Sequence, residues 1–265
     1  MGKFIGTIAS YAMEPRGKNG KIDIPKLIEL LKQAGITTHC YIMHAKREYT
    51  LSQFRELLAA AEKAGIKIWT TLLPPAEDGA LVIPHGLDYV KWAEELARLS
   101  LQYPNFELWT MDDFSHEMGF FTPSYVSRFT SAARAINPKL AFGVCVYYPA
   151  LRPFVEKGYG PMVDAVYWGY RSESVAFGGT SSKELPAEIE HYQKLLPGKA
   201  VFPIIYVSRH SRWPPDLPTL EYIEDCLTIS WHKTGTAFMY CLPLDPDNPK
   251  YHLVKRLIAT WRKHR

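Results

Sequence analysis

The stretch "IPKLIELLKQAGITTHCYIM", residues 24–43, contains the pattern that decides the fold of this chain. Its first half places apolar residues at helical spacing, an Ala-Gly pair at Gly35 ends the helix, and a β-rich run follows. The stretch "QFRELLAAAEKAGIKIWTTLL", residues 53–73, repeats this order, with Gly65 at the turn. A recurring unit of helix, tight turn and buried strand is typical of a parallel α/β fold.

Further strand-like and helical runs continue the alternation along the chain. The predicted strands are 3–11, 37–43, 66–72, 106–111, 140–147, 163–168, 200–207 and 236–242. Beyond the two helices already quoted, the predicted helices are 87–102, 123–136, 150–157, 184–195, 219–233 and 249–263. We therefore predict an α/β protein with one (β/α)8 TIM-barrel domain over residues 1–265. The alternative is a doubly wound open sheet, which would use fewer strands and a glycine-rich first turn that "SYAMEPRGKNG" does not match.

Composition and charge narrow the range of partners. The 265 residues are 47% hydrophobic and 22% charged, which is typical of a globular chain with one large core. The net charge of +4 is spread along the chain, and the one dense basic cluster is the terminal "WRKHR", so we expect no nucleic-acid partner. No run approaches the roughly 18 apolar residues that span a bilayer, so we expect no membrane partner. The oligomeric state stays open.

The four cysteines indicate a cellular location. Cys40, Cys145, Cys226 and Cys241 form no CxxC pair, and three of them fall inside predicted strands. Buried free thiols are therefore favoured over disulfides or a metal site. Free thiols fit a reducing compartment, so we expect a cytoplasmic protein, with secretion after removal of a leader as the alternative.

Two adjacent aspartates follow the fourth predicted strand in "FELWTMDDFSHE", residues 106–117. In a TIM barrel, residues at the C-terminal ends of the strands line the active site. Side-chain alternation then directs one of Asp112 and Asp113 toward the barrel axis and the other toward the loop. The alternative role, capping of the next helix, is already filled by Thr122 and Pro123. Asp112 and Asp113 are therefore the candidate catalytic residues.

Aromatic and basic residues collect at the other strand ends. Flat apolar rings with hydroxyl or indole groups suit a sugar, which has both C–H faces and many hydroxyls. Any one of the tyrosines could equally be an ordinary half-buried strand residue. The candidate substrate-binding residues are Tyr11, His44, Tyr147, Trp168, Tyr170, Arg171, Tyr206, Arg209 and Tyr240.

Cleavage of a glycosidic bond needs an acid for the leaving oxygen and a second group at the anomeric centre. The acids Glu48, Glu173 and Asp245 lie in loops, so none is an obvious partner from a second strand end. Adjacent aspartates suit a different arrangement. One carboxylate orients a 2-acetamido group, whose carbonyl oxygen attacks the anomeric carbon, and the other serves as general acid and base.

The segment "TMDDFS", residues 110–115, resembles the Asp-Asp pair of substrate-assisted glycoside hydrolases, most closely the O-GlcNAcase-type β-N-acetylglucosaminidases. This resemblance implies that Asp112 orients the acetamido group and that Asp113 is the acid and base. The chain departs from that family in its first strand, which lacks a Gly-Phe-Tyr-Gly stretch, and it also lacks the DxxDxDxE pattern of chitinases.

Two other classes stay open. Asp112, Asp113, His116 and Glu117 could bind a divalent metal, as in barrel lyases, isomerases and hydrolases, but no HxH motif completes the ligand set. A non-catalytic carbohydrate-binding barrel is the third class, because fold does not determine function. The preferred prediction is a glycosidase that needs no metal and no cofactor. The sugar, the linkage, retention or inversion, and endo or exo action are not predicted.

Overall fold

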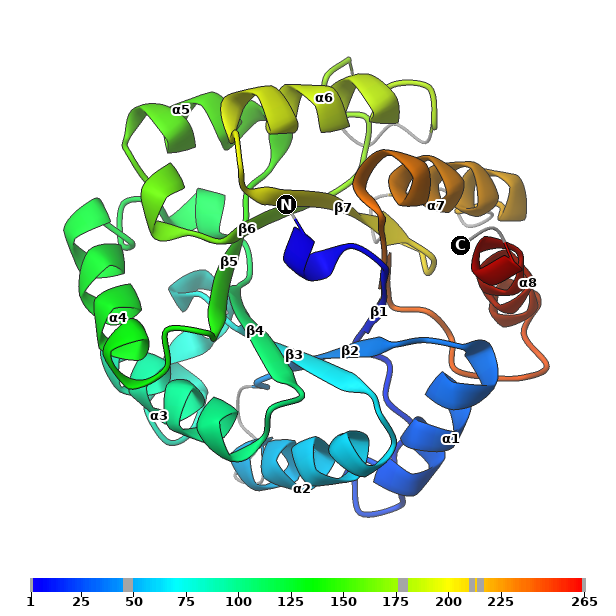
Figure 1. The fold of residues 1–265 in the computed structure, drawn as a ribbon, viewed down its shortest axis with the longest axis horizontal. Coiled ribbons are helices and arrows are strands. Elements are labelled where there is room, and N and C mark those ends of the chain that lie inside the picture. The colour runs from blue at the N-terminus through cyan, green and yellow to red at the C-terminus, as the bar shows by residue number, and fades with distance from the viewer. Residues whose placement is uncertain (1, 45–49, 176–180, 210–212, 214–216, 264–265) are drawn as a thin grey trace. The chain divides into compact units, whose positions relative to one another are not determined.

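Strands and helices alternate along the chain in the computed structural model, which describes residues 2–44, 50–175, 181–209, 213 and 217–263 (Figure 1). The strands are β1 (Thr7–Tyr11), β2 (Thr38–Ile42), β3 (Lys67–Leu72), β4 (Phe106–Met111), β5 (Ala141–Cys145), β6 (Ala165–Gly169), β7 (Ala200–Tyr206) and β8 (Thr236–Tyr240). The α-helices are α1 (Ile24–Ala34), α2 (Thr50–Lys63), α3 (Tyr89–Gln102), α4 (Pro123–Ile136), α5 (Leu151–Glu156), α6 (Leu185–Leu195), α7 (Leu220–Thr234) and α8 (Pro249–Lys263).

Within these residues the eight strands form a closed barrel in sequence order. The pairings are parallel, and the barrel closes where Thr7 of β1 lies opposite Thr236 of β8. The predicted (β/α)8 barrel is therefore confirmed, and the open-sheet alternative is wrong. Among the described helices, none has both the length and the apolar character that a membrane crossing requires.

The chain divides into two compact units, one of residues 1–39 and 168–265 and one of residues 40–167. The first contains β1, β7, β8, α1 and α6 to α8, and the second contains β3 to β5 and α2 to α5. Because the chain divides in this way, a single domain over residues 1–265 stays a prediction.

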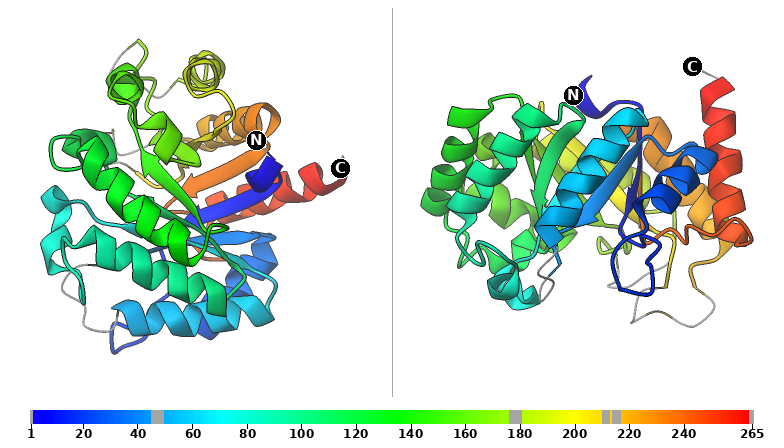
Figure 2. Two further views of the ribbon diagram at one scale, coloured as in Figure 1. Left: turned by 60° about the vertical axis from the view of Figure 1, so that its left-hand side comes forward. Right: turned by 90° about the horizontal axis from the view of Figure 1, so that it is seen from below.

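In the first unit, aromatic rings pack edge to face between the strands. Phe202 of β7 lies 6.2 Å from Phe4 and 5.9 Å from Phe238 of β8, between ring centroids, and Phe238 lies 6.0 Å from Tyr11. On the outside of this unit α8 lies beside α1, where the hydroxyl of Tyr251 donates to a backbone oxygen of α1 at 2.8 Å (Figure 2).

In the second unit, β4 is positioned by aromatic packing on its outer face. Trp109 is buried, and its ring lies 5.7 Å from Phe129 of α4 and 4.4 Å from Phe142 of β5. Since side chains alternate along a strand, Thr110 and Asp112 point to the opposite side from Trp109. The burial of Trp109 thereby directs Asp112 away from the helices.

Local signals in the sequence set the helix boundaries. Asp23 caps α1 by accepting the N–H of Lys26 at 3.0 Å, and Gly35 ends that helix with φ of +79°. Thr122 caps α4 in the same way. The first strand is shorter than the predicted 3–11, because Gly6 has φ of +89° and residues 2–4 form a 3-10 turn.

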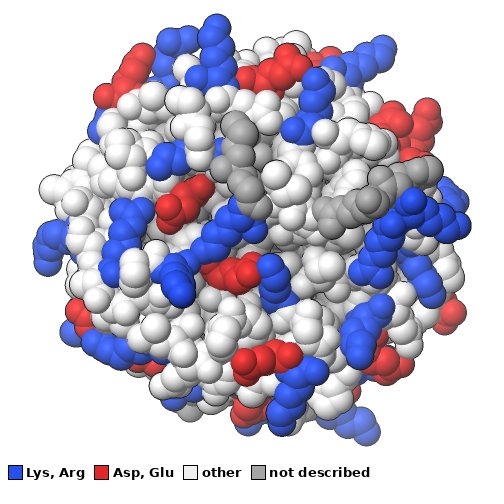
Figure 3. Space-filling model, in the orientation of Figure 1, with Lys and Arg blue, Asp and Glu red and all other residues white. Residues whose placement is uncertain are grey.

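The four cysteines are free thiols, as predicted; Cys40, Cys145 and Cys226 are buried and Cys241 is half-buried. Basic and acidic side chains of the described residues are intermixed on the face shown in Figure 3.

Candidate active site

Asp112 and Asp113 lie where β4 ends, and the chain turns sharply between them. The N–H of Asp112 still donates to the oxygen of Leu72 at 3.0 Å, which extends the β3–β4 pairing by one residue. Asp113 leaves the strand with φ of +40°, a left-handed conformation that aspartate tolerates better than most residues. Its N–H donates to Oδ1 of Asp112 at 3.0 Å. The turn therefore presents two half-buried carboxylates from adjacent residues.

Both oxygens of Asp113 have polar partners. The hydroxyl of Tyr147, just beyond β5, donates to Oδ1 at 2.7 Å. Nδ1 of His116 lies 3.4 Å from Oδ2, and the His116 ring stacks on Tyr147 with centroids 4.8 Å apart. Tyr147, predicted from the sequence to bind substrate, thus contacts the predicted catalytic Asp113.

Glu77 brings a third carboxyl group to this cluster. It ends the 3-10 turn η2 (Pro75–Glu77), in the connection between β3 and α3. The N–H of Ala76 donates to Oε1 of Glu117 at 3.2 Å, which ties this turn to the segment after β4. The negative charges of Asp112 and Asp113 act on the Glu77 carboxyl group. We refer to Glu77, Asp112 and Asp113 as the carboxyl cluster.

The carboxyl cluster changes the protonation of Glu77. Although the residue is exposed as a whole, its carboxyl group is partly enclosed by protein, and this desolvation raises its pKa. The negative charges of Asp112 and Asp113 act in the same direction, and the pKa is raised to about 8. This shift favours the protonated form of Glu77 near neutral pH.

Sequence reasoning missed Glu77. It lies beyond the end of β3, next to two prolines, and no local pattern connects it to residues 36 positions later. The one available signal was the long, Gly- and Pro-containing connection after the third strand, because long loops at strand ends commonly carry functional residues.

A metal site at this position is not favoured by the donor set. Three potential ligand atoms lie within 4.8 Å of one another: one carboxylate oxygen of Asp112, one of Asp113 and the sulfur of Cys145. However, burial and the charges of both aspartates raise the pKa of the Cys145 thiol well above its usual value, whereas a thiol must lose its proton to bind a metal. Of the other residues in the metal alternative, Glu117 accepts the Ala76 N–H and His116 lies against Asp113.

In the first unit, three predicted substrate-binding tyrosines come together at the ends of β1, β7 and β8. The Tyr240 ring stacks on Tyr11, with centroids 5.4 Å apart, and lies 4.8 Å from Tyr206. Gly169 allows this packing, since a Cβ there would lie 2.6 Å from the Tyr206 hydroxyl. Tyr11 and Tyr206 are buried and Tyr240 is half-buried, so Tyr240 presents the most accessible ring of the three.

Three other predicted binding residues are enclosed in the first unit. Trp168 is 1% exposed and stacks on Tyr192 of α6 with centroids 3.8 Å apart. Protein covers this ring in the structure, and a sugar-binding role for Trp168 stays a prediction. Tyr170 is completely buried and its hydroxyl donates to the Ser181 oxygen at 2.6 Å, so it has no surface for a sugar either. Arg171 is buried and forms an ion pair with Glu173.

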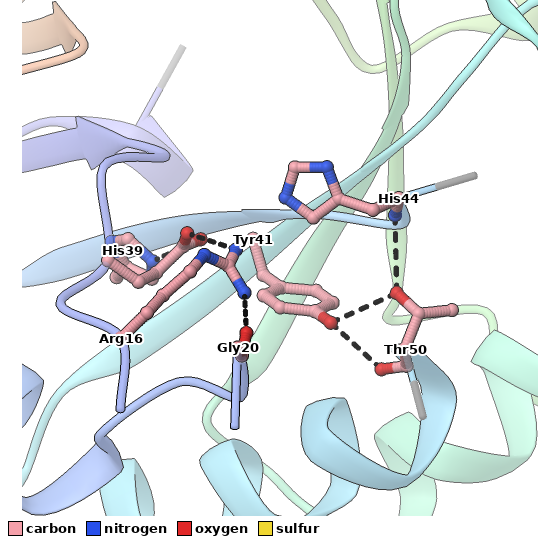
Figure 4. A network of polar contacts seen from close by, with 7 residues as sticks. Arg16, Gly20, His39, Tyr41, His44 and Thr50 are labelled. Atoms are coloured by element: carbon pink, nitrogen blue, oxygen red, sulfur yellow. Dashed lines mark hydrogen bonds and ion pairs between the residues drawn. The ribbon is translucent and has the colours of Figure 1, made fainter. Parts of the chain in front are cut away.

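His44 and Arg209 complete the predicted set, and their binding roles stay predictions. His44 is half-buried, and its N–H donates to Oγ1 of Thr50 at 3.2 Å (Figure 4). Arg209 is exposed, and its Nε donates to the Trp213 oxygen at 3.0 Å. Glu48 lies outside the described residues.

A separate polar network lies in the first unit (Figure 4). The Ser10 hydroxyl is 2.9 Å from Nδ1 of His39, and Nε2 of His39 is 3.4 Å from Oε1 of Glu14. Arg16 pairs with the same carboxylate at 3.2 Å and donates to the Gly20 oxygen at 3.0 Å. Serine, histidine and glutamate are the residue types of a nucleophilic triad, but Ser10 and His39 are both 0% exposed. The network is therefore structural.

The Glu14 network predicts how stability depends on pH. Burial alone would raise the pKa of Glu14, but the hydrogen bond and charge of His39 and the charge of Arg16 outweigh it and lower the pKa from 4.5 to about 2. A carboxyl group with a depressed folded-state pKa contributes stability above its unfolded pKa and loses it as the pH falls through the folded value. We expect the melting temperature to drop between pH 4.5 and 2.

Melting curves of Glu14→Gln between pH 5 and pH 2 test this expectation. The variant should be less stable than the wild type at pH 7 and should lose less stability on acidification. Glu29→Gln, at an exposed position on α1, is the control and should keep the wild-type slope. Equal slopes for Glu14→Gln and wild type would contradict the assignment.

Comparison with known proteins shows the fold of this chain. No family model and no curated protein matches the sequence. A GH18 chitinase from Pseudoalteromonas aurantia has a TM-score of 0.65 at 12% identity, with coverage of 94% of this chain and 99% of the chitinase. A GH99 endo-α-mannosidase from Bacteroides thetaiotaomicron also has a TM-score of 0.65 at 12% identity, with coverage of 98% and 96%.

A second group of similar structures is longer than this chain. A β-D-glucuronidase of Dictyoglomus thermophilum has a TM-score of 0.62 at 14% identity, over 96% of this chain and 50% of the glucuronidase. In a Bacteroides uniformis β-glucuronidase, with a TM-score of 0.61 at 14% identity, the match covers 90% of this chain and 30% of that protein. This chain thus spans a half or less of these glucuronidases. At such identities the shared feature is the barrel that these glycoside hydrolases have in common.

Proposed function

We propose that this protein is a glycoside hydrolase whose carboxyl cluster cleaves the glycosidic bond of a 2-acetamido sugar. The observation that carries the proposal is the carboxyl cluster itself, with the Tyr147 hydroxyl bound to Asp113 at 2.7 Å. Carboxyl groups in different protonation states at one site are what acid-catalysed glycoside cleavage requires. The barrel fold shared with glycoside hydrolases is consistent with this function.

The spacing of the carboxylates favours assistance by the substrate. In the ordinary retaining mechanism, two carboxyl groups flank the sugar from separate positions roughly 5–5.5 Å apart. Asp112 and Asp113 instead come from one strand end, with oxygens within 4.8 Å of each other, and the other strand ends offer no obvious carboxylate for the opposite side of a sugar. A nucleophile within the substrate removes the need for a carboxylate on the opposite side.

In this reaction each aspartate has its own role. Asp112 orients the acetamido group, and the acetamido carbonyl oxygen attacks the anomeric carbon while the glycosidic C–O bond breaks. Asp113 delivers the proton to the leaving oxygen, and in the second half it accepts a proton from the water that opens the cyclic intermediate.

A panel of 4-nitrophenyl glycosides tests the proposal. We expect release of 4-nitrophenol from a 2-acetamido glycoside, and much slower release from the matched sugar with a 2-hydroxyl group, because the internal nucleophile is then missing. EDTA should leave the rate unchanged. Equal rates for both sugars would contradict substrate assistance, and no turnover across the panel would contradict the hydrolase function itself.

A further inference from the structure

We propose that His116 forms the binding surface for the leaving group of the substrate, and that this surface takes a leaving group that is itself a flat ring, such as a second pyranose or a phenyl ring. This inference rests on the function proposed above and names the part of the substrate that lies beside Asp113. In the sequence, His116 was a candidate for metal binding alone.

The imidazole of His116 is held beside the carboxylate of Asp113. Its Nδ1 lies 3.4 Å from Oδ2 of Asp113, and the backbone N–H of His116 donates to the Asp113 carbonyl oxygen at 2.9 Å. The ring stacks on Tyr147 with centroids 4.8 Å apart and planes 14° from parallel. The backbone N–H of Tyr147 donates to Oγ of Ser115 at 3.2 Å, which ties Tyr147 to the turn η4 (Phe114–Glu117) that carries His116. The position of the imidazole is therefore set from both β4 and β5.

The hydrogen bond from Tyr147 indicates which oxygen of Asp113 delivers the proton. The Tyr147 hydroxyl donates to Oδ1 at 2.7 Å. A protonated carboxyl group accepts best at the oxygen without the proton, so the proton of the acid lies on Oδ2. The leaving oxygen must then come within about 2.6–3.2 Å of Oδ2 to receive it. Because Nδ1 of His116 lies beside the same Oδ2, the group attached to the leaving oxygen reaches the imidazole.

The exposed surface of His116 suits a flat ring. The side chain is 58% exposed, whereas that of Asp113 is 25% exposed. Tyr147 covers one face of the imidazole, so the exposed surface includes the opposite face. An aromatic face binds another flat, apolar face by stacking, and both the C–H face of a pyranose and a phenyl ring provide one. With Asp112 assigned to the acetamido group, the two neighbours of Asp113 divide the substrate between them.

Calorimetric binding of two thioglycosides tests this surface without turnover. Both carry the same 2-acetamido sugar, with either a phenyl or a methyl group on a sulfur that replaces the oxygen protonated by Asp113. In His116→Ala, the Kd of the phenyl ligand should rise by roughly 5- to 10-fold, the usual effect of one aromatic contact, and that of the methyl ligand by less than about two-fold. His116→Phe keeps a flat ring and should bind both ligands as the wild type does. His252→Ala, at an exposed position on α8, is the control.

NMR spectra of the histidine rings locate the contact. The His116 ring resonances, assigned by their absence in His116→Phe, should move much further with the phenyl ligand than with the methyl ligand. Melting curves should show that each variant is folded, since the His116 side chain is largely exposed.

Three results would overturn the leaving-group surface: equal weakening of both ligands in His116→Ala, unchanged binding of the phenyl ligand in that variant, or a wild-type protein that binds neither ligand. Turnover of a 2-acetamido glycoside together with unchanged binding in His116→Ala would reject the surface and keep the hydrolase function. Selective loss of the phenyl ligand in a protein that cleaves no glycoside would instead reject the hydrolase function and leave the surface standing.

Discussion

Asp113→Asn should lower the turnover of an unactivated glycoside by at least about 100-fold, the loss typical of a missing general acid. Asparagine tolerates the left-handed backbone at this position, where φ is +40°, and its amide oxygen can still accept the Tyr147 hydroxyl. The variant should therefore fold normally and lose only the proton donor. Rates with a disaccharide substrate and a melting curve of each protein would check both statements.

Substrates with a good leaving group separate the roles of the two aspartates. The loss in Asp113→Asn should shrink for a 4-nitrophenyl glycoside, because that leaving group needs no proton. Asp112→Asn should impair both kinds of substrate, since orientation at the anomeric centre is needed for each. Asp78→Asn is the control, as another aspartate with left-handed backbone, at φ of +62°. Activity that vanished with EDTA and returned with a divalent ion would instead make the aspartates metal ligands.

Trp168→Ala should destabilise the protein by about 3–5 kcal/mol, the usual cost of removing a large buried aromatic side chain. The ring is 1% exposed and stacked on Tyr192, so its removal leaves a cavity between β6 and α6. It also removes the Nε1–H that donates to Glu188 at 3.3 Å, leaving a buried carboxyl group with fewer partners. For a chain of this size the melting temperature should fall by roughly 10 °C.

Two comparison variants make this prediction specific. Trp168→Phe keeps a ring against Tyr192 and loses only the indole donor, so its melting temperature should fall much less. Tyr240→Ala removes a half-buried ring and should lower stability less than Trp168→Ala while weakening sugar binding. A Trp168→Ala protein with wild-type stability and weaker sugar binding would return Trp168 to the binding role expected from the sequence.

The barrel could be predicted from the sequence because its signals are local. Helical spacing of apolar residues, glycine at the turns and short β-rich runs each act within a few residues, and the long alternation of such units leaves few folds to choose from. The position of Asp112 and Asp113 could be predicted as well. A carboxylate that follows a strand of a parallel barrel lies on the face where active sites form. The function could be narrowed to a class of chemistry and no further.

The tertiary structure decided which of the side chains at the strand ends are accessible. Adjacent residues of β6 point to opposite faces: the Tyr167 hydroxyl donates to Oγ1 of Thr110, whereas Trp168 packs on α6. A one-residue change in the register of β6 would exchange the faces to which these two side chains point. The residue types in "YWGY" do not determine that register.

The surroundings of Asp113 depend on the fold in the same way, because Tyr147, which donates to it, and Glu77, whose pKa its charge raises, are distant from it in sequence and follow the ends of neighbouring strands. The sequence alone determined the architecture and the position of the aspartates. Only the packing of β4 and β5 brought the Tyr147 hydroxyl onto Asp113, because local sequence does not encode the distances between residues of different strands.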